Sequence, residues 1–147
     1  MSLTNVIDYL RGNFTELEIT LRPGASEDLI QKVEEIYDIV LPKDIIQFYR
    51  FSNGFDTYDW MFNLIPMEEM IEQKIKYNKP LSLAEYLIYS ETWLLKVDED
   101  DHDSYSITIS DGKDDVILTH SLAEFIQRFL KGGLHGEDGL CHWPSQL

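Results

Sequence analysis

The chain has a single cysteine, no long hydrophobic run and few basic residues. Cys141 has no second cysteine to pair with, so an internal disulfide is excluded and an oxidising compartment offers no advantage. No stretch approaches the roughly 20 consecutive apolar residues that cross a membrane as a helix. The first ten residues include Asp8 and lack the basic start and apolar run of a secretory signal. We therefore expect a cytoplasmic protein.

Positive charge is scarce. Lys and Arg number 12 against 27 Asp and Glu, which gives a net charge of −15 at pH 7. Nucleic acids and anionic membranes are therefore not the expected partners, because both are polyanions. The excess of carboxylates is explained either by solubility or by attraction to a basic partner. A net charge of −7 falls within one segment, where Lys113 is opposed by eight acidic residues. These are Asp98, Glu99, Asp100, Asp101, Asp103, Asp111, Asp114 and Asp115.

The composition is that of one folded domain. Apolar residues make up 44% of the 147 residues and aromatic residues 12%, which excludes a disordered chain. A domain of this size buries roughly 70% of the surface of its unfolded chain, which is enough for a core without disulfides. No internal repeat or linker is visible.

Helices dominate the first half. Apolar spacing predicts helices over residues 3–10 and 26–37, with Ser26 as the N-cap of the second. A third helix begins at Leu41-Pro42 and stops at Asn53-Gly54, and a fourth begins at Pro66. Residues 17–21 are expected to be extended, and residues 60–64 to form a strand.

Strands dominate the second half. They are predicted over residues 86–90, 93–97, 105–109 and 116–118, with a turn at Asp111-Gly112. Ser121 and Glu124 form a capping box for a last helix, which ends at Gly132-Gly133 before a flexible tail. The links between strands are too short for parallel crossovers. The prediction is an α+β fold, with a central, mostly antiparallel sheet flanked by helices.

No motif for catalysis or for phosphate or metal binding is recognisable. The phosphate-binding loop, the HExxH zinc motif and the GxSxG nucleophile elbow are all missing. The acidic run is not an EF-hand, because Ser104 and Ser110 replace its glycine and its bidentate glutamate. The tail from His135 to His142 holds two imidazoles, a thiol and two carboxylates, but not at the spacing of a structural zinc site. We expect a non-enzymatic protein without catalytic residues, metal or cofactor.

Aromatic residues supply candidate anchors for a partner. Phe55, Tyr58 and Trp60 follow a helix stop, and their role as core or as partner contacts is left open. Trp143 either packs on the last helix or lies exposed. The candidate partner-binding residues combine these aromatics with the acidic run. They are Phe55, Tyr58, Trp60, Asp98, Glu99, Asp100, Asp101 and Asp103.

Several of these features occur in a known order. The helix of residues 26–37 runs into Leu41-Pro42-Lys43-Asp44 and then Ile46-Gln47-Phe48-Tyr49, up to Asn53-Gly54. An acidic strand hairpin and a terminal helix opening at Ser121 follow. In this order the chain resembles the SUKH superfamily, which includes fungal regulators of cell-wall glucan synthesis and many bacterial immunity proteins. The likeness covers roughly residues 23–131.

We expect a single SUKH-like domain over residues 1–147, with its core at about 23–131 and a C-terminal tail at 132–147; the N-terminal helix and the tail beyond Gly133 fall outside the resemblance. The resemblance implies no cofactor and no catalytic residue. The long disordered extensions of the fungal regulators are missing here, which favours a stand-alone bacterial role. The leading hypothesis is an immunity protein that neutralises a cognate basic toxin, such as a nuclease, by stoichiometric binding. The alternative is a regulatory or scaffold module for an endogenous protein, as in cell-wall synthesis. The sequence does not specify an oligomeric state.

Overall fold

The computed structural model describes residues 2–58, 61–110 and 114–147. Its helices in these ranges are α1 (Leu3–Asn13), α2 (Glu27–Tyr37), α3 (Lys43–Phe51), α4 (Met67–Tyr77) and α5 (Leu122–Gly132). The strands are β1 (Ile19–Leu21), β2 (Phe55–Thr57), β3 (Phe62–Leu64), β4 (Ser82–Tyr86), β5 (Glu91–Val97), β6 (Tyr105–Ser110) and β7 (Asp115–Thr119). Two short 3-10 helices, η1 (Leu140–His142) and η2 (Pro144–Gln146), follow α5.

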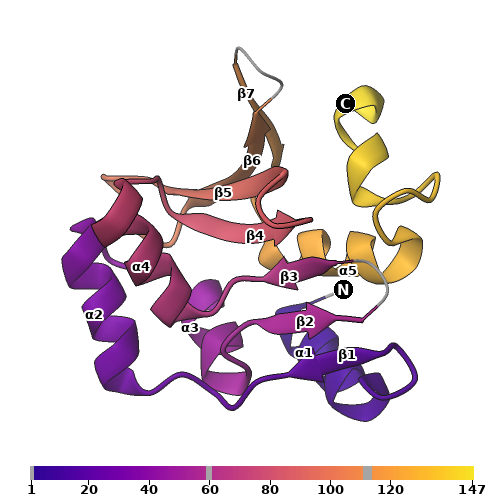
Figure 1. The fold of residues 1–147 in the computed structure, drawn as a ribbon, viewed down its shortest axis with the longest axis horizontal. Helices are drawn as coiled ribbons and strands as arrows, with labels where there is room; N and C mark the ends of the chain where they lie inside the picture. The colour runs from indigo at the N-terminus through magenta and orange to yellow at the C-terminus, as the bar shows by residue number, and fades with distance from the viewer. Residues whose placement is uncertain (1, 59–60, 111–113) are drawn as a thin grey trace.

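The strands form one sheet in which each strand pairs antiparallel with the next along the chain. Figure 1 shows α1 and α5 behind the strands, while α2 and α4 stand beside each other at the left end. The α2–α4 and α1–α5 pairs are in contact, and α3 packs against α1. The expected α+β fold, with a central antiparallel sheet flanked by helices, is confirmed.

Aromatic side chains join α5 to the sheet. The Phe62 ring in β3 stacks on Phe129, with centroids 4.4 Å apart and planes at 20°. Trp93 meets the same Phe62 ring edge-on at 5.4 Å.

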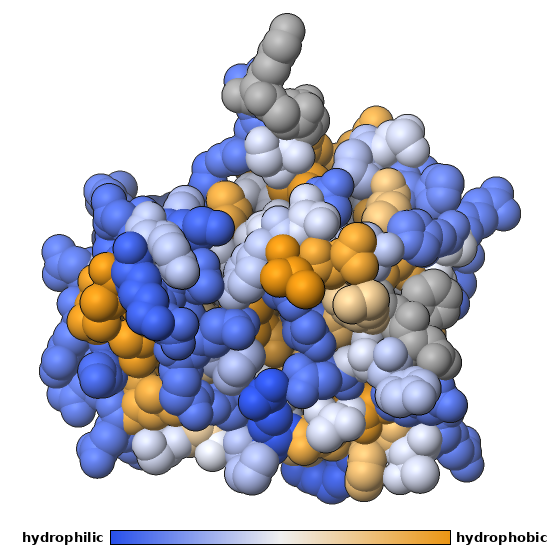
Figure 2. Space-filling model, viewed as in Figure 1, coloured by the Kyte–Doolittle hydropathy of each residue, from blue (hydrophilic) through white to orange (hydrophobic). Residues whose placement is uncertain are grey.

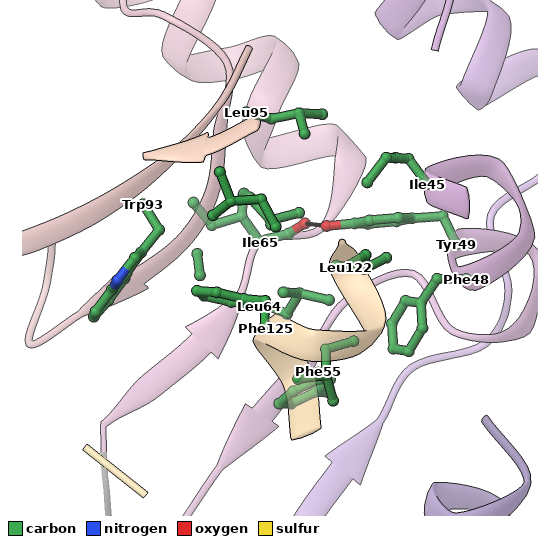
Figure 3. Packing of buried hydrophobic residues seen from close by; sticks show 14 of the residues in the cluster. Ile45, Phe48, Tyr49, Phe55, Leu64, Ile65, Trp93, Leu95, Leu122 and Phe125 are labelled. Atoms are coloured by element: carbon green, nitrogen blue, oxygen red, sulfur yellow. Dashed lines mark hydrogen bonds between the residues drawn. The ribbon is translucent and has the colours of Figure 1, made fainter. Parts of the chain in front are cut away.

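A buried hydrogen bond also lies within the core. The Tyr49 hydroxyl donates it to the Ile65 carbonyl at 2.6 Å, as Figure 3 marks. Burial, followed by the nearby Glu69 charge, raises the pKa of Tyr49, so this buried hydroxyl remains a donor.

Two predicted helix starts are confirmed. The Ser26 hydroxyl accepts a hydrogen bond from the Leu29 amide at 3.2 Å. The Ser121 hydroxyl accepts one from the Glu124 amide at 3.1 Å. The reciprocal half of the capping box is not formed, because the Ser121 amide donates to the Thr119 hydroxyl instead.

The strand predicted over residues 86–90 is wrong. The strand lies earlier, at Ser82–Tyr86, and the next three residues adopt the left-handed backbone conformation. The Glu85 carboxylate stabilises this turn: it accepts a 2.6 Å hydrogen bond from the Asn63 side chain and a 2.8 Å bond from the Tyr89 amide. These bonds satisfy a carboxylate that is almost fully buried. A polar residue at a buried strand position is what concealed β4 in the sequence.

The prediction that the C-terminal tail is flexible is also wrong. Leu134 and Leu140 are fully buried, and Trp143 is nearly so. The Trp143 and Phe125 rings stack with centroids 6.5 Å apart and planes at 25°, and the Arg128 guanidinium lies 4.8 Å from the centroid of the Trp143 ring. A side chain at Gly132 would meet the Asp138 carbonyl carbon at 2.3 Å, so glycine there lets the tail fold back closely. The tail therefore extends the core.

Replacing Trp143 by alanine tests this packing. Trp143→Ala removes a buried ring from α5 and should lower the free energy of unfolding by about 3 kcal/mol. Urea unfolding followed by far-ultraviolet circular dichroism measures the change. His142→Ala, at an exposed neighbouring position, should change it by less than about 0.5 kcal/mol. Equal, small effects of both substitutions would contradict a packed tail.

A second pair of substitutions tests the turn after β4. Ile88 is 83% exposed with a φ of 52°, a conformation that disfavours β-branched residues. Ile88→Asn should raise the free energy of unfolding by about 1 kcal/mol, because asparagine tolerates the left-handed region. The same change at Ile117, an exposed residue of strand β7, should lower it by up to about 1 kcal/mol. Shifts of the same sign in urea midpoints would show that the turn is not left-handed.

Candidate interaction surface

The sequence-predicted partner residues do not form one site. Tyr58 follows β2 at the sheet end where β3 starts and β4 stops. Asp98 follows β5, whose seven residues span roughly 20 Å, so it lies at the opposite end of the sheet. Phe55 is fully buried against Phe48 and Phe62. The structure thus places Phe55 in the core and not among partner contacts, and Trp60 lies outside the described residues.

Tyr58 belongs to an end of the sheet that exposes apolar side chains. Tyr58 and Ile88 are each 83% exposed, and Met61 and Leu87 are exposed as well. The Leu87 amide donates a 3.0 Å hydrogen bond to the Met61 carbonyl, which ties the two turns together. Figure 2 shows an orange patch near the centre of the view, over the turn between β4 and β5. Sequence reasoning missed this patch because it assigned residues 86–90 to a strand.

The acidic segment of residues 98–115 is divided between two ends of the sheet. Strand β6 separates the loop at residues 98–104 from the loop before β7, and its six residues cover roughly 20 Å. Asp115, beyond β6, is hydrogen-bonded to Lys96. Asp111 lies outside the described residues. The described acidic residues of this segment therefore do not share one surface.

The loop between β5 and β6 is held by its own carboxylates. Asp98 accepts a 2.9 Å hydrogen bond from the Asp100 amide. Asp101 accepts bonds from the Asp103 amide at 3.2 Å and from the Ser104 hydroxyl at 3.0 Å. The Asp98 amide donates to the Ser104 carbonyl at 2.9 Å, which closes the loop. Such local bonds order a turn, so the loop presents its charges in a defined arrangement.

Asp103 attaches this loop to the start of α3. Its carboxylate accepts a 3.3 Å hydrogen bond from the Lys43 amide and lies 3.4 Å from the Lys43 ammonium. Desolvation raises the pKa of Asp103, but the amide bond, the Lys43 charge and His102 together outweigh it, so the pKa lies below its usual value. Asp103 thus anchors the loop to α3, while residues 98–101 are exposed, with the Asp98 and Asp101 carboxylates bonded inside the loop.

A shallow groove of about 770 Å³ separates this loop from the C-terminal end of α2. In Figure 1 the upper end of α2 points toward the left end of β5. Three apolar residues line the groove, namely Ile39, Val40 and Val97. Five carboxylates also line it, namely Glu34, Glu35, Asp38, Asp98 and Glu99. Sequence reasoning missed Glu34, Glu35 and Asp38 at the C-terminal end of α2, because only the fold brings them to the loop.

The polar residues of the tail that could act as metal ligands are not brought together. Across the described ranges, no group of three or more His, Cys, Asp and Glu side chains is arranged to hold a metal ion. His135 packs edge-on against Tyr86 at 5.7 Å. Burial and the Glu91 charge raise the pKa of the Cys141 thiol, which disfavours a thiolate. In the same ranges, no helix is long and apolar enough to cross a bilayer.

Comparison with known proteins places this arrangement in a family. No curated protein matches the chain in sequence. The model of the SMI1 / KNR4 family (SUKH-1) matches residues 24–136, which is most of the chain and runs from α2 through α5. The domains of that family are generally non-catalytic and serve in immunity or regulation. With a match of this extent on an α+β fold with an antiparallel sheet, the chain belongs to the SMI1 / KNR4 family (SUKH-1).

Proposed function

We propose that this protein is a bacterial, cytoplasmic immunity protein that neutralises a cognate toxin by stoichiometric binding. The toxin domain is basic, as a nuclease must be where it holds phosphates. The binder blocks its partner by occupying a surface, so no bond is made or broken. Membership in a family of immunity and regulatory domains supports this role.

The observation that carries the proposal is the outward-facing acidic loop between β5 and β6. Its carboxylates are ordered before any partner arrives, because Asp98 and Asp101 bond to amides of the same loop. A preordered surface loses less conformational entropy on binding than a flexible one. The net charge of −15 extends the attraction beyond the contact itself and raises the rate of encounter with a basic protein.

Capture from the native host identifies the partner. The purified protein, immobilised and exposed to host extract, should retain a basic toxin domain, and its expression should rescue cells that produce this toxin. Recovery of a resident cell-wall or regulatory protein, without rescue from any toxin, would contradict the immunity role. That outcome would favour the regulatory or scaffold alternative.

Neutralising the loop tests the electrostatic part. With the captured toxin, the variant Asp98→Asn, Glu99→Gln, Asp100→Asn, Asp101→Asn should associate about 10-fold more slowly at low salt, and with weaker salt dependence. Asparagine retains an oxygen for the amide bonds inside the loop. Stopped-flow fluorescence measures the rate. A control variant loses four exposed charges elsewhere, by Glu16→Gln, Asp28→Asn, Glu124→Gln and Glu137→Gln. Equal slowing of the two variants would show that only net charge matters.

A further inference from the structure

Helix α2 carries charges of the unfavourable sign at its C-terminal end. A helix C-terminus is the negative pole of the backbone dipole and is stabilised by basic residues. Among the α-helices of the described ranges, α1, α3, α4 and α5 each have a basic residue in the last turn, and α2 has none. It ends instead with Glu34, Glu35 and then Asp38 as the left-handed C-cap. This end of α2 therefore concentrates negative potential that its own helix does not compensate.

A second element adds to the same potential. The loop after β5 brings Asp98 and Glu99 to the groove beside α2. Among the described residues that line this groove, none is lysine or arginine. The Glu34 carboxylate has one hydrogen-bond partner, since it accepts a 2.8 Å bond from the Leu41 amide. The like charges brought together here repel one another in the free protein.

The groove also has an apolar component. Val40 is 53% exposed, and Ile39 and Val97 line the groove beside it. A lysine or arginine side chain has a long aliphatic stem and a charged head. The exposed Val40 matches the stem in chemistry, and the carboxylates that line the groove match the head. A purely polar or anionic ligand would match only one of these two features, or neither.

We propose that this groove is the docking site for a lysine- or arginine-bearing segment of the protein partner. The aliphatic stems lie on Val40, and the cationic heads face Glu35 and Asp38 from α2 and Asp98 and Glu99 from the loop. This inference rests on the proposed function, because it places the basic surface of the toxin at one end of the sheet. A second copy of this chain fits poorly, since two copies with a charge of −15 each repel.

A charge reversal in α2 separates docking from folding. Glu35→Lys removes one like charge and supplies the missing cation at the helix end, so its urea unfolding midpoint should rise. The same substitution places a positive charge in the groove and should weaken binding of a basic segment at least 10-fold. Glu16→Lys, on the loop before β1, changes the net charge equally and is the matched control. It should change that affinity less than about twofold.

A defined probe tests docking without knowledge of the toxin. The probe is a capped peptide of twelve alternating lysine and alanine residues, added to the full-length, ¹⁵N-labelled protein at 150 mM salt. Amide shifts should concentrate in residues 31–40 and 97–102, and Glu35→Lys should suppress them. The same peptide with glutamate for lysine should cause none. Amide shifts spread evenly over all acidic regions, or no shifts at all, would overturn the inference. A dimer in sedimentation velocity that Glu35→Lys dissociates would also overturn it, because a second copy would then occupy the groove.

The two proposals fail in distinguishable ways. If the protein rescues cells from its toxin and Glu35→Lys rescues equally well, then the immunity role stands and the groove is not the docking site. If the peptide maps to the groove and no toxin is ever captured, then the docking site stands and the immunity role falls.

Discussion

The stacking of Phe62 on Phe129 is the contact on which the rest of the structure depends. It fixes α5 across the sheet at 4.4 Å, and Trp93 and Phe125 pack around the same ring. Once α5 is in place, Phe125 supplies the surface on which Trp143 of the tail lies. Large aromatic rings in direct contact dominate the energetics of a core this size. The aromatic contacts thereby join strands β3 and β5 to α5 and to the tail.

The order of the strands in the sheet determines where acidic residues can lie close together. In an antiparallel sheet with sequential pairing, successive loops alternate between the two ends, so a continuous acidic stretch is divided by any strand within it. Strand β6 divides residues 98–115 in this way. The same rule brings the loop after β5 next to α2, which is some 60 positions earlier in the chain. A concentrated acidic surface therefore arises from two distant segments and not from one run of aspartates.

Local signals in the sequence predicted local structure well. Ser26 and Ser121 marked helix starts because a hydroxyl that accepts an amide hydrogen bond acts within three residues. Alternation in Tyr105, Ile107 and Ile109 marked the strand β6, but its expected wet face is only partly correct, since Thr108 is buried and Ile109 is partly exposed where the register shifts. The fold class followed from such signals together with the short links between strands.

Signals that depend on distant partners were not available from the sequence. Glu85 looks like a surface residue until Asn63 and the Tyr89 amide are found within hydrogen-bonding distance. Phe55 follows a helix stop and looked like part of a loop, yet β2 pairs with β1 and β3 and places its ring in the core. The groove was missed for the same reason, because Glu35 and Asp38 acquire their acidic neighbours only when the sheet forms.

The location of the groove also separates partner choice from folding. On α2, Ile30 and Val33 are buried in the core, while Glu35 lies on the opposite, exposed side of the helix and lines the groove. Substitutions at the groove therefore leave core packing intact, so one fold can serve partners that differ in surface charge. The clustered carboxylates also act against wrong partners, since an acidic protein brought to this end of the sheet meets like charge. Repulsion that slightly destabilises the free protein thus supplies both attraction to a basic partner and rejection of an acidic one.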